Sequence, residues 1–166
     1  MSNVKQRILG IDPGFGRIGW GIIEGEKSQW RHVAHGCIET ETKDPFLDRL
    51  LEIEAALKKI IADYRPTHSA VEELFFHTNV TTAMKVGQAR GVILLTLVGA
   101  GVQVRECTPL QIKQTMTGYG RADKRQVKVM VQTELGLPAI PTPDDAADAL
   151  AAALTGAFLY RSAHRF

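Results

Sequence analysis

Hydrophobic positions in the first forty residues fall into three runs that are separated by short polar or glycine-rich breaks. The runs cover residues 7–11, 17–24 and 30–40, with turns at Pro13-Gly14 and 25–28 between them. Apolar runs of this length, bounded by Pro/Gly turns, predict β-strands. Because the connections are too short for crossovers, the three strands should form an antiparallel meander.

The remainder of the chain alternates between helical and extended patterns. Apolar residues recur at three- and four-residue steps from Phe46 to Tyr64, which predicts an amphipathic helix that has Asp44-Pro45 at its start and Pro45 at its first position. Further helices are expected at 78–99, 108–117, 124–135 and from 143 onward, and further strands at 68–76 and 102–106. This order requires right-handed crossovers and parallel pairing of the later strands.

These elements predict one α/β domain over residues 1–166, built on a mixed five-stranded sheet with helices around it. A chain of 166 residues, 45% of them hydrophobic, is long enough to form one substantial core. The first residues are polar, the two cysteines show no metal-binding spacing, and the longest uncharged stretches are too short to span a bilayer. We therefore expect a cytoplasmic protein with reduced thiols.

The formal net charge of +2 gives the molecule no overall basic field that would indicate a nucleic-acid partner. Between residues 105 and 130, however, there are six Lys or Arg residues and only two acids. This basic segment fits a partner that carries phosphates, and it fits a solvated helix face equally well.

Acidic residues occur near the ends of two predicted strands. Asp12 ends the first strand, and Glu72 and Glu73 lie near the end of the fourth. If these strands are parallel neighbours, Asp12 and Glu72 meet at the sheet edge where α/β proteins build their sites. Taken alone, Asp12 before Pro-Gly is more often a plain turn residue.

The last predicted helix adds further acids. It starts after Thr142-Pro143, and Asp144 in its first turn is interpreted as a residue that caps the helix and interacts with its dipole. Asp145 and Asp148 lie three residues apart and share a helix face. The uncharged run at 149–160 indicates a buried helix, on which Asp148 needs a partner that no nearby Lys or Arg supplies.

Four carboxylates in one place would repel and raise one another's pKa, and a divalent cation would relieve that repulsion. Because every ligand would be an oxygen, the ion should be Mg²⁺ or Mn²⁺, and the histidines and cysteines show no zinc spacing. Two such ions would generate the attacking hydroxide and stabilise the leaving 3′ oxygen of a phosphodiester. The residues alone therefore favour a metal-dependent nuclease or another phosphoryl-transfer enzyme.

Several stretches of the chain resemble the RuvC family of Holliday-junction resolvases, bacterial endodeoxyribonucleases with an RNase H-like fold. The resemblance lies at 8–14, 70–72, 74–75, 87–91 and 145–150, more loosely at 127–137, and at 112–115 and 123–124, where the family carries basic residues. These stretches keep the family's order and cover nearly the entire chain. The resemblance implies metal-dependent hydrolysis of DNA phosphodiester bonds in recombination and repair.

The resemblance also implies which acids form the active site. The catalytic and metal-binding carboxylates would be Asp12, Glu72, Asp145 and Asp148, with Glu72 and Asp145 preferred over their acidic neighbours. They would hold Mg²⁺ or Mn²⁺, two ions per active site. Some members of the family carry His at the place of Asp145, so this ligand is replaceable.

For DNA binding, the resemblance implies that Lys113 and Lys124 act at the active site, where they hold the scissile phosphate or offset charge in the transition state. Phe75 would stack at the unpaired bases of the junction centre. Three further basic residues are expected to contact flanking phosphates, although each singly fits a solvated face better: Arg121, Arg125 and Lys128.

A homodimer with two active sites is a further implication of the resemblance, each site nicking one of two symmetry-related strands of a four-way junction. A partnership with the RuvAB branch-migration complex is implied as well. The predicted helix at 78–99 is the candidate dimer contact, because Ala83, Gly87 and Gly91 would allow close approach. Packing of these small residues on the protein's own sheet is an equal alternative.

Three other classes of protein compete with this interpretation. The RuvX/YqgF-like relatives, which are linked to ribosomal RNA processing, share the Asp-Pro-Gly opening but are shorter and do not present Lys113, Lys124 and Phe75 together. An actin-like ATPase fragment would need two such domains and an adenosine site. A DNA-bending dimer without cleavage has no need of four clustered acids. The sequence therefore favours the resolvase.

Overall fold

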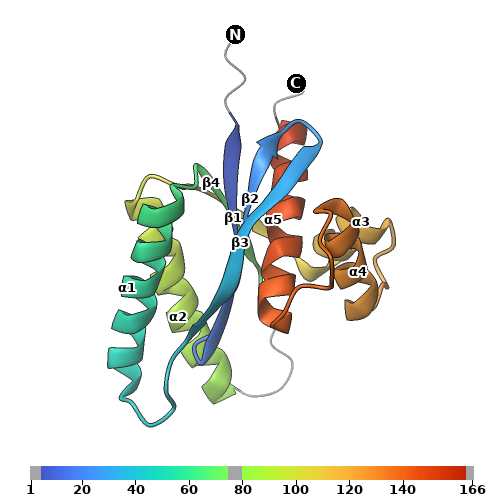
Figure 1. Cartoon of the computed structure of the whole chain (residues 1–166). Helices are drawn as coiled ribbons and strands as arrows, with labels where there is room; N and C mark the ends of the chain where they lie inside the picture. The colour runs from blue at the N-terminus through green and yellow to red at the C-terminus, as the bar shows by residue number, and fades with distance from the viewer. Residues whose placement is uncertain (1–4, 75–79, 164–166) are drawn as a thin grey trace.

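The central strand of the sheet is β1 (Gln6–Asp12), in which residues 8–11 are all buried. In the computed structural model, which describes residues 5–74 and 80–163, β1 pairs antiparallel with β2 (Arg17–Glu26) and parallel with β4 (His68–Glu72). β3 (Gln29–Glu39) pairs antiparallel with β2, and β5 (Gln103–Cys107) pairs parallel with β4. The strand order is therefore β3-β2-β1-β4-β5 (Figure 1).

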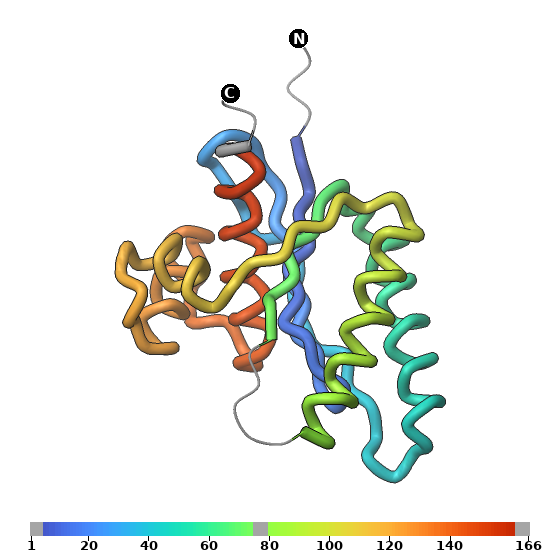
Figure 2. The backbone as a smooth tube through the Cα atoms, turned by 180° about the vertical axis from the view of Figure 1, so that it is seen from behind, coloured from blue at the N-terminus to red at the C-terminus, as the bar shows by residue number. Residues whose placement is uncertain are grey.

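Helices cover both faces of this sheet (Figures 1 and 2). α1 (Phe46–Tyr64) and α2 (Val80–Gly99) lie on one face. α5 (Asp144–Ala163) lies on the other, and α3 (Pro109–Thr117) and α4 (Lys124–Glu134) pack against its outer side. The buried hydrophobic residues accordingly form two clusters, one on each side of the sheet.

Side-chain alternation along β1 determines which face each of its residues joins. Leu9 and Ile11 pack in the cluster beneath α1 and α2, whereas Ile8 packs in the cluster beneath α5. Successive residues of a strand point to opposite faces, so Gly10 and Asp12 share the α5 side with Ile8. Asp12 is thus directed toward the helix that carries the other candidate acids.

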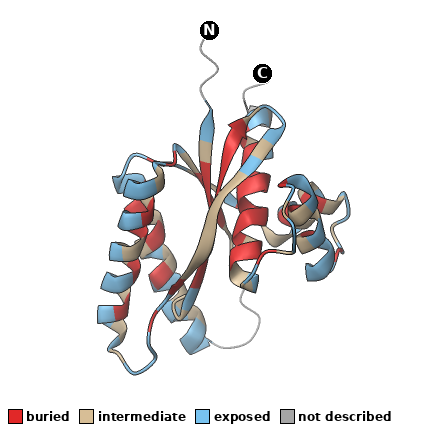
Figure 3. Cartoon of the chain, in the orientation of Figure 1, coloured by how far each residue is buried: buried red, intermediate tan, exposed pale blue. Residues whose placement is uncertain are grey.

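α5 lies unusually close to the sheet because small residues meet on both sides of the contact. A Cβ atom on Gly10 would lie 1.8 Å from the Ala149 carbonyl oxygen, so only glycine fits there. Figure 3 shows that much of α5 is buried. Its fully buried alanines are Ala146, Ala147, Ala149, Ala151, Ala152 and Ala153. The close contact brings the first turns of α5 against the ends of the central strands.

The predicted mixed sheet, with an antiparallel meander followed by parallel strands, is confirmed. Differences occur at the ends of elements. β4 ends at Glu72, because its partner β5 stops at Cys107 where Thr108 caps the next helix. The last two residues of the predicted fourth strand, 75 and 76, lie outside the described residues.

The starts of two helices also differ from the prediction. Pro45 occupies the N-cap of α1 and not its first helical position, and Asp44 provides no side-chain cap. α5 begins at Asp144, and Pro143 lies before it after a cis bond to Thr142. None of the described helices is long and apolar enough to cross a membrane.

Candidate active site

The carboxyl ends of the two central parallel strands bring Asp12 and Glu72 together. Ile11 pairs with Val71 in the register of β1 and β4, so the following residue of each strand lies beside the other on the α5 side. The two carboxyl groups are close enough to interact, because the charge of Glu72 contributes to the raised pKa of Asp12. Parallel pairing thus creates the pair of acids that the sequence predicts.

α5 adds Asp145 and Asp148 to this end of the sheet. The Asp148 side chain is only 16% exposed, and the charge of Asp145, which is 34% exposed, still acts on Asp12. The partner of Asp148 is Lys124, whose Nζ lies 3.1 Å from Oδ2. This lysine belongs to α4 and lies 24 residues before Asp148 in the sequence. The positive charge that Asp148 requires is therefore supplied by the packing of α4 against α5 and not by a neighbour in the chain.

A cavity of about 440 Å³ lies at this end of the sheet. Its acids come from β1, β4 and α5 and from the residue after β4, whereas its two lysines come from α3 and α4. The residues that line it are Asp12, Glu72, Glu73, Leu74, Pro109, Ile112, Lys113, Lys124, Val127, Asp148 and Ala151. The cavity therefore combines a cluster of acids with a partly apolar, basic wall.

Burial raises the pKa of Asp12 to about 8, and the charges of Glu72, Asp148 and Asp145 add to this effect. Lys124 acts in the opposite direction. The pKa of Glu72 is also raised, first by burial and then by the charge of Asp148. The cluster therefore holds a proton at neutral pH when no cation compensates its negative charge.

Two capped helices position the lysines of the cavity. Thr108 forms a capping box at the start of α3, which carries Lys113, and Asp123 forms one at the start of α4. Lys124 directly follows Asp123, so this cap fixes its backbone next to α5. The charge of Asp148 raises the pKa of Lys124, which stays protonated.

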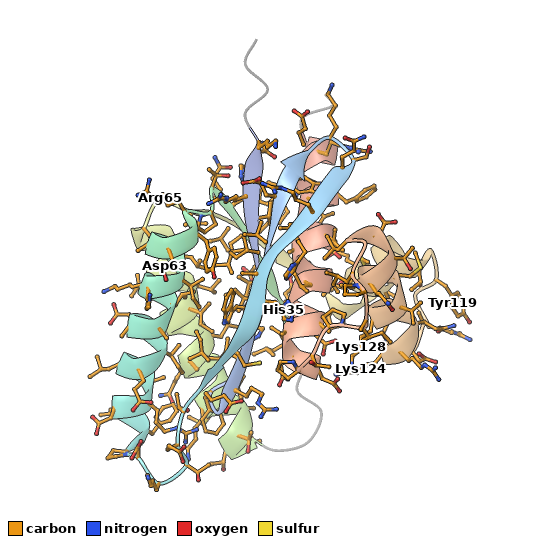
Figure 4. All side chains as sticks on the ribbon, viewed as in Figure 1. His35, Asp63, Arg65, Tyr119, Lys124 and Lys128 are labelled. Carbon is orange, nitrogen blue, oxygen red and sulfur yellow. The ribbon has the colours of Figure 1, made fainter. Side chains whose placement is uncertain are left out.

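The other residues predicted to bind DNA lie outside this cavity. Arg121 and Arg125 are exposed around the start of α4. Lys128 is only 12% exposed, and its Nζ lies 2.7 Å from the carboxylate of Asp144. Figure 4 shows Lys124 and Lys128 on the same side of the molecule, near the start of α5. Phe75 lies outside the described residues.

Arg49 on α1 supports the turn after Asp12 and was not recognised from the sequence. It is 5% exposed, its Nε donates to Thr40 Oγ1 at 2.9 Å, and its Nη2 donates to the Phe15 carbonyl oxygen at 3.3 Å. Its guanidinium carbon also lies 4.6 Å from the centre of the Phe15 ring. An arginine on the otherwise apolar stripe of α1 is the signal that could have revealed it.

Arg17 at the start of β2 is a second residue that the sequence did not reveal. Its Nη1 lies 3.6 Å from Asp145 Oδ2, and its Nη2 lies 3.0 Å from Glu39 Oε1. The contact with Asp145 arises because β2 packs beneath α5. No local spacing in the sequence contains this information.

The candidate ligands suit a hard divalent cation, because all of their donor atoms are carboxylate oxygens. Within residues 5–74 and 80–163, however, no three His, Cys, Asp or Glu side chains stand ready as a metal-binding group. The raised pKa of Asp12 still marks a place where negative charge is insufficiently compensated. A bound cation would thus require these side chains to turn toward it.

Comparison with known proteins identifies the family. A model of the family "Crossover junction endodeoxyribonuclease RuvC" matches residues 8–156. The chain belongs to the RuvC family. A Rubrobacter xylanophilus protein with the same description is 56% identical over 160 residues, which cover 96% of this chain and 89% of that protein.

Solved structures of RuvC from Thermus thermophilus agree with this assignment. One has a TM-score of 0.87 at 38% identity and covers 95% of this chain and 97% of its own. Another, a complex with Holliday junction substrate, has a TM-score of 0.91 at 37% identity and covers 95% and 96%. The predicted family, its RNase H-like fold and its endodeoxyribonuclease class are thereby confirmed, and the three competing classes are set aside.

Proposed function

We propose that this chain resolves Holliday junctions by paired, symmetric nicks in two opposing strands, with residues 1–166 as one nuclease domain. The observation that carries the proposal is the cavity in which Asp12, Glu72 and Asp148 lie beside Lys113 and Lys124. A cluster of acids in which Asp12 holds a proton at neutral pH is suited to a cation, and adjacent lysines are suited to phosphates. The RuvC relative that was solved with Holliday junction substrate supports four-way DNA as the ligand.

Asp12, Glu72, Asp145 and Asp148 are the residues that would hold Mg²⁺ or Mn²⁺, with two ions in each active site. Bound ions would supply activation of water for attack and stabilisation of charge on the leaving 3′ oxygen. Asp12 would lose its proton on ligation, because the cation replaces the proton as the compensating charge. The four side chains would also rotate toward a common point.

Lys113 and Lys124 would bind the scissile phosphate from the α3–α4 side. Both line the cavity beside the acids, and Lys124 is held in place by Asp148. The apolar side chains of Ile112 and Val127 line the same wall. They lower the local dielectric constant, so the attraction between lysine and phosphate is stronger there than in water.

Further contacts would hold the DNA on either side of the cut. Arg121 and Arg125, which are exposed, would bind phosphates of the junction arms. Lys128 would divide its charge between Asp144 and the DNA, since it already lies 2.7 Å from that carboxylate. Phe75 would stack on bases at the junction centre. Binding through phosphates should weaken steeply as salt rises.

A homodimer would be formed through α2, which carries an apolar stripe on its exposed side. Val80, Met84, Leu95 and Val98 are 76%, 63%, 74% and 62% exposed, and they follow one another at helical spacing. Gly87 and Gly91 complete the stripe, and a Cβ atom at either would meet no described residue within 4 Å. A partner helix could approach closely there, and the two-fold dimer would match a two-fold junction.

In the cell, we place this activity in the cytoplasm, in DNA recombination and repair. Branch migration by a RuvAB complex would supply the junction that the dimer cuts. Membership of the RuvC family supports the role in recombination, because the family's description names crossover junctions. Neither statement changes the chemistry assigned to the cavity.

The test is cleavage of a synthetic mobile four-way DNA junction in Mg²⁺ and in Mn²⁺. Wild type should produce paired symmetric nicks, and Asp12→Asn should bind the junction without cutting it. Asp144→Asn is the matched control, because Asp144 pairs with Lys128 outside the cavity. Binding without cleavage by wild type in either metal would contradict the proposal, as would cutting of RNA or linear duplex in preference to junctions.

A further inference from the structure

Arg17 reaches the acid cluster from the sheet side of α5. Its Nη1 lies 3.6 Å from Asp145 Oδ2, and its Nη2 lies 3.0 Å from Glu39 Oε1, its cross-strand neighbour on β3. The Arg17 side chain is 52% exposed. Its guanidinium therefore stands at the edge of the active site, in contact with both the cluster and solvent.

Basic side chains accompany all three acids at the start of α5. The pairs are Asp144–Lys128 at 2.7 Å, Asp145–Arg17 at 3.6 Å and Asp148–Lys124 at 3.1 Å. The two lysines belong to α4, whereas the arginine belongs to β2. Both views place α5 between the sheet and the α3–α4 pair (Figures 1 and 2), so the basic partners approach it from opposite sides.

The contact between Arg17 and Asp145 is loose. A separation of 3.6 Å is longer than a hydrogen bond, and ion pairs exposed to this degree contribute little to stability. Glu39 is itself 61% exposed, so it can exchange Arg17 for water. Arg49 shows the opposite behaviour, since it is buried and hydrogen-bonded to the protein. Arg17 is thus available to a ligand, whereas Arg49 is not.

We propose that Arg17 binds a phosphate of the cleaved DNA strand on the β2–β3 side of the active site, opposite Lys113 and Lys124. The inference rests on the proposed function, because it assigns a contact to the same DNA. A planar guanidinium donates two parallel N–H bonds to a phosphate, a geometry that lysine lacks. Glu39 holds the Arg17 side chain beside the cluster in the absence of DNA. When DNA binds, the phosphate takes the place of the Glu39 carboxylate.

The alternative role for Arg17 is to orient Asp145 for cation binding. That role predicts weaker Mg²⁺ binding by Arg17→Gln together with an unchanged salt dependence of DNA binding. A phosphate contact predicts a changed salt dependence, because each lost contact reduces the slope of log K against log salt by about 0.9. The two roles therefore differ in a measurement that requires no catalysis.

Junction binding is measured with a chelator present, so that nothing is cut, between about 50 and 200 mM salt. Arg17→Gln should bind roughly ten-fold more weakly, with a slope smaller by about 0.9 for each subunit engaged. Arg17→Lys should keep the slope, and Glu39→Gln should bind more tightly because a competing carboxylate is gone. Arg31→Gln is the matched control, since Arg31 forms a cross-strand pair with Glu24 farther along the same two strands.

Single neutral methylphosphonates along the strand near the cut then locate the contact. One of them should weaken binding by wild type and have no further effect on Arg17→Gln. An unchanged slope and an unchanged methylphosphonate pattern in Arg17→Gln would overturn the inference. Failure of the proposed function would look different, because wild type itself would then lack metal-dependent junction cleavage. If Arg17→Gln does not fold, Glu39→Gln decides the question: tighter junction binding with the same sensitive methylphosphonate position supports the contact, and binding equal to that of wild type overturns the inference.

Discussion

Asp12 is the residue at which folding conflicts with the ionisation of a carboxyl group. Its position at the end of a buried strand removes water from the carboxyl group, and three further acids surround it. Both effects disfavour the ionised form and raise its pKa to about 8. Without a cation, folding therefore requires that Asp12 take up a proton that the unfolded chain would release.

This linkage predicts how the stability of the metal-free protein depends on pH. The pKa of Asp12 rises from 3.8 to about 8 on folding, so its favourable contribution is complete below pH 4 and is lost as pH rises toward 8. Asp12→Asn cannot ionise, and its melting temperature at pH 8 in a chelator should exceed that of wild type by at least about 2 °C.

The difference between Asp12→Asn and wild type should shrink when the melting curves are repeated at pH 5. Asp144→Asn serves as the control, because the hydrogen bond from Lys128 lowers the pKa of Asp144. The ionised form of Asp144 is the stabilising one, so this substitution should lower the melting temperature and not raise it. A gain for Asp12→Asn that is equal at both pH values would show that Asp12 is not the titrating group.

Residues at the ends of strands could be recognised from sequence, whereas contacts between distant segments could not. The proximity of Asp12 and Glu72 was predictable, because parallel strands place their carboxyl ends at one edge. The pair Lys124–Asp148 depends on how α4 packs against α5. Arg17 reaches Asp145 only because β2 lies under α5. Such contacts follow from tertiary packing and leave no local pattern in the chain.

The contact of α5 with β1 and β2 is the element-scale feature that assembles the site. At Gly19, a Cβ atom would lie 1.9 Å from the carbonyl oxygen of Asp145, and at Gly10 it would lie 1.8 Å from that of Ala149. Backbone atoms cannot give way as a flexible side chain can. The position of the acids on α5 therefore depends directly on the absence of side chains on the strands.

Gly19→Ala should displace the start of α5 and with it Asp145. We expect a loss of about 3 kcal/mol in the free energy of unfolding, measured by urea titration, and a loss of cleavage activity. Gly16→Ala is the matched control in the preceding turn, where the new Cβ would lie 3.5 Å from Arg49 Nη2, an ordinary contact. Equal stability of the two variants would mean that α5 can shift without cost.

The presence and type of the elements with strong periodicity were predicted correctly, whereas the residues at which elements begin and end were predicted less accurately. α1 matches the apolar spacing from Phe46 to Tyr64. Its start was misplaced because a proline fits both the N-cap and the first helical position, and backbone geometry decides between them. The end of β4 was misplaced because it depends on where β5 stops. A strand needs a partner, so its length is not a property of its own sequence.

At the scale of the whole molecule, connection lengths made the topology predictable. Short turns imposed the antiparallel meander, and helix-length crossovers imposed the parallel strands that follow it. The role of α2 was not predictable in the same way, since small residues fit either its own sheet or another chain. Among the described residues, nothing lies within 4 Å of a Cβ atom placed on Gly87 or Gly91, whereas Ala89 is fully buried. This arrangement favours the proposed role of α2 in contact with a second copy over packing of its glycines on its own sheet.

A charge on this apolar stripe should separate the proposed dimer without unfolding the protomer. Met84→Glu and Leu95→Glu change side chains that are 63% and 74% exposed, so neither disturbs the core. Sedimentation should show a dimer dissociation constant raised by about two orders of magnitude, because the charges would be buried in an apolar interface. Val129→Glu, at an apolar position on α4 that is 40% exposed, should leave the dimer intact.

Cleavage by the separated protomers then tests whether the two active sites act together. A dimer bound to one junction can nick both strands before it dissociates, so wild type should yield paired cuts in a supercoiled plasmid that extrudes a cruciform. Monomeric Met84→Glu should yield singly nicked circles in excess over linear product, with the chemistry of each nick preserved. Paired cutting by a variant that sediments as a monomer would show that α2 is not the contact that coordinates the two sites.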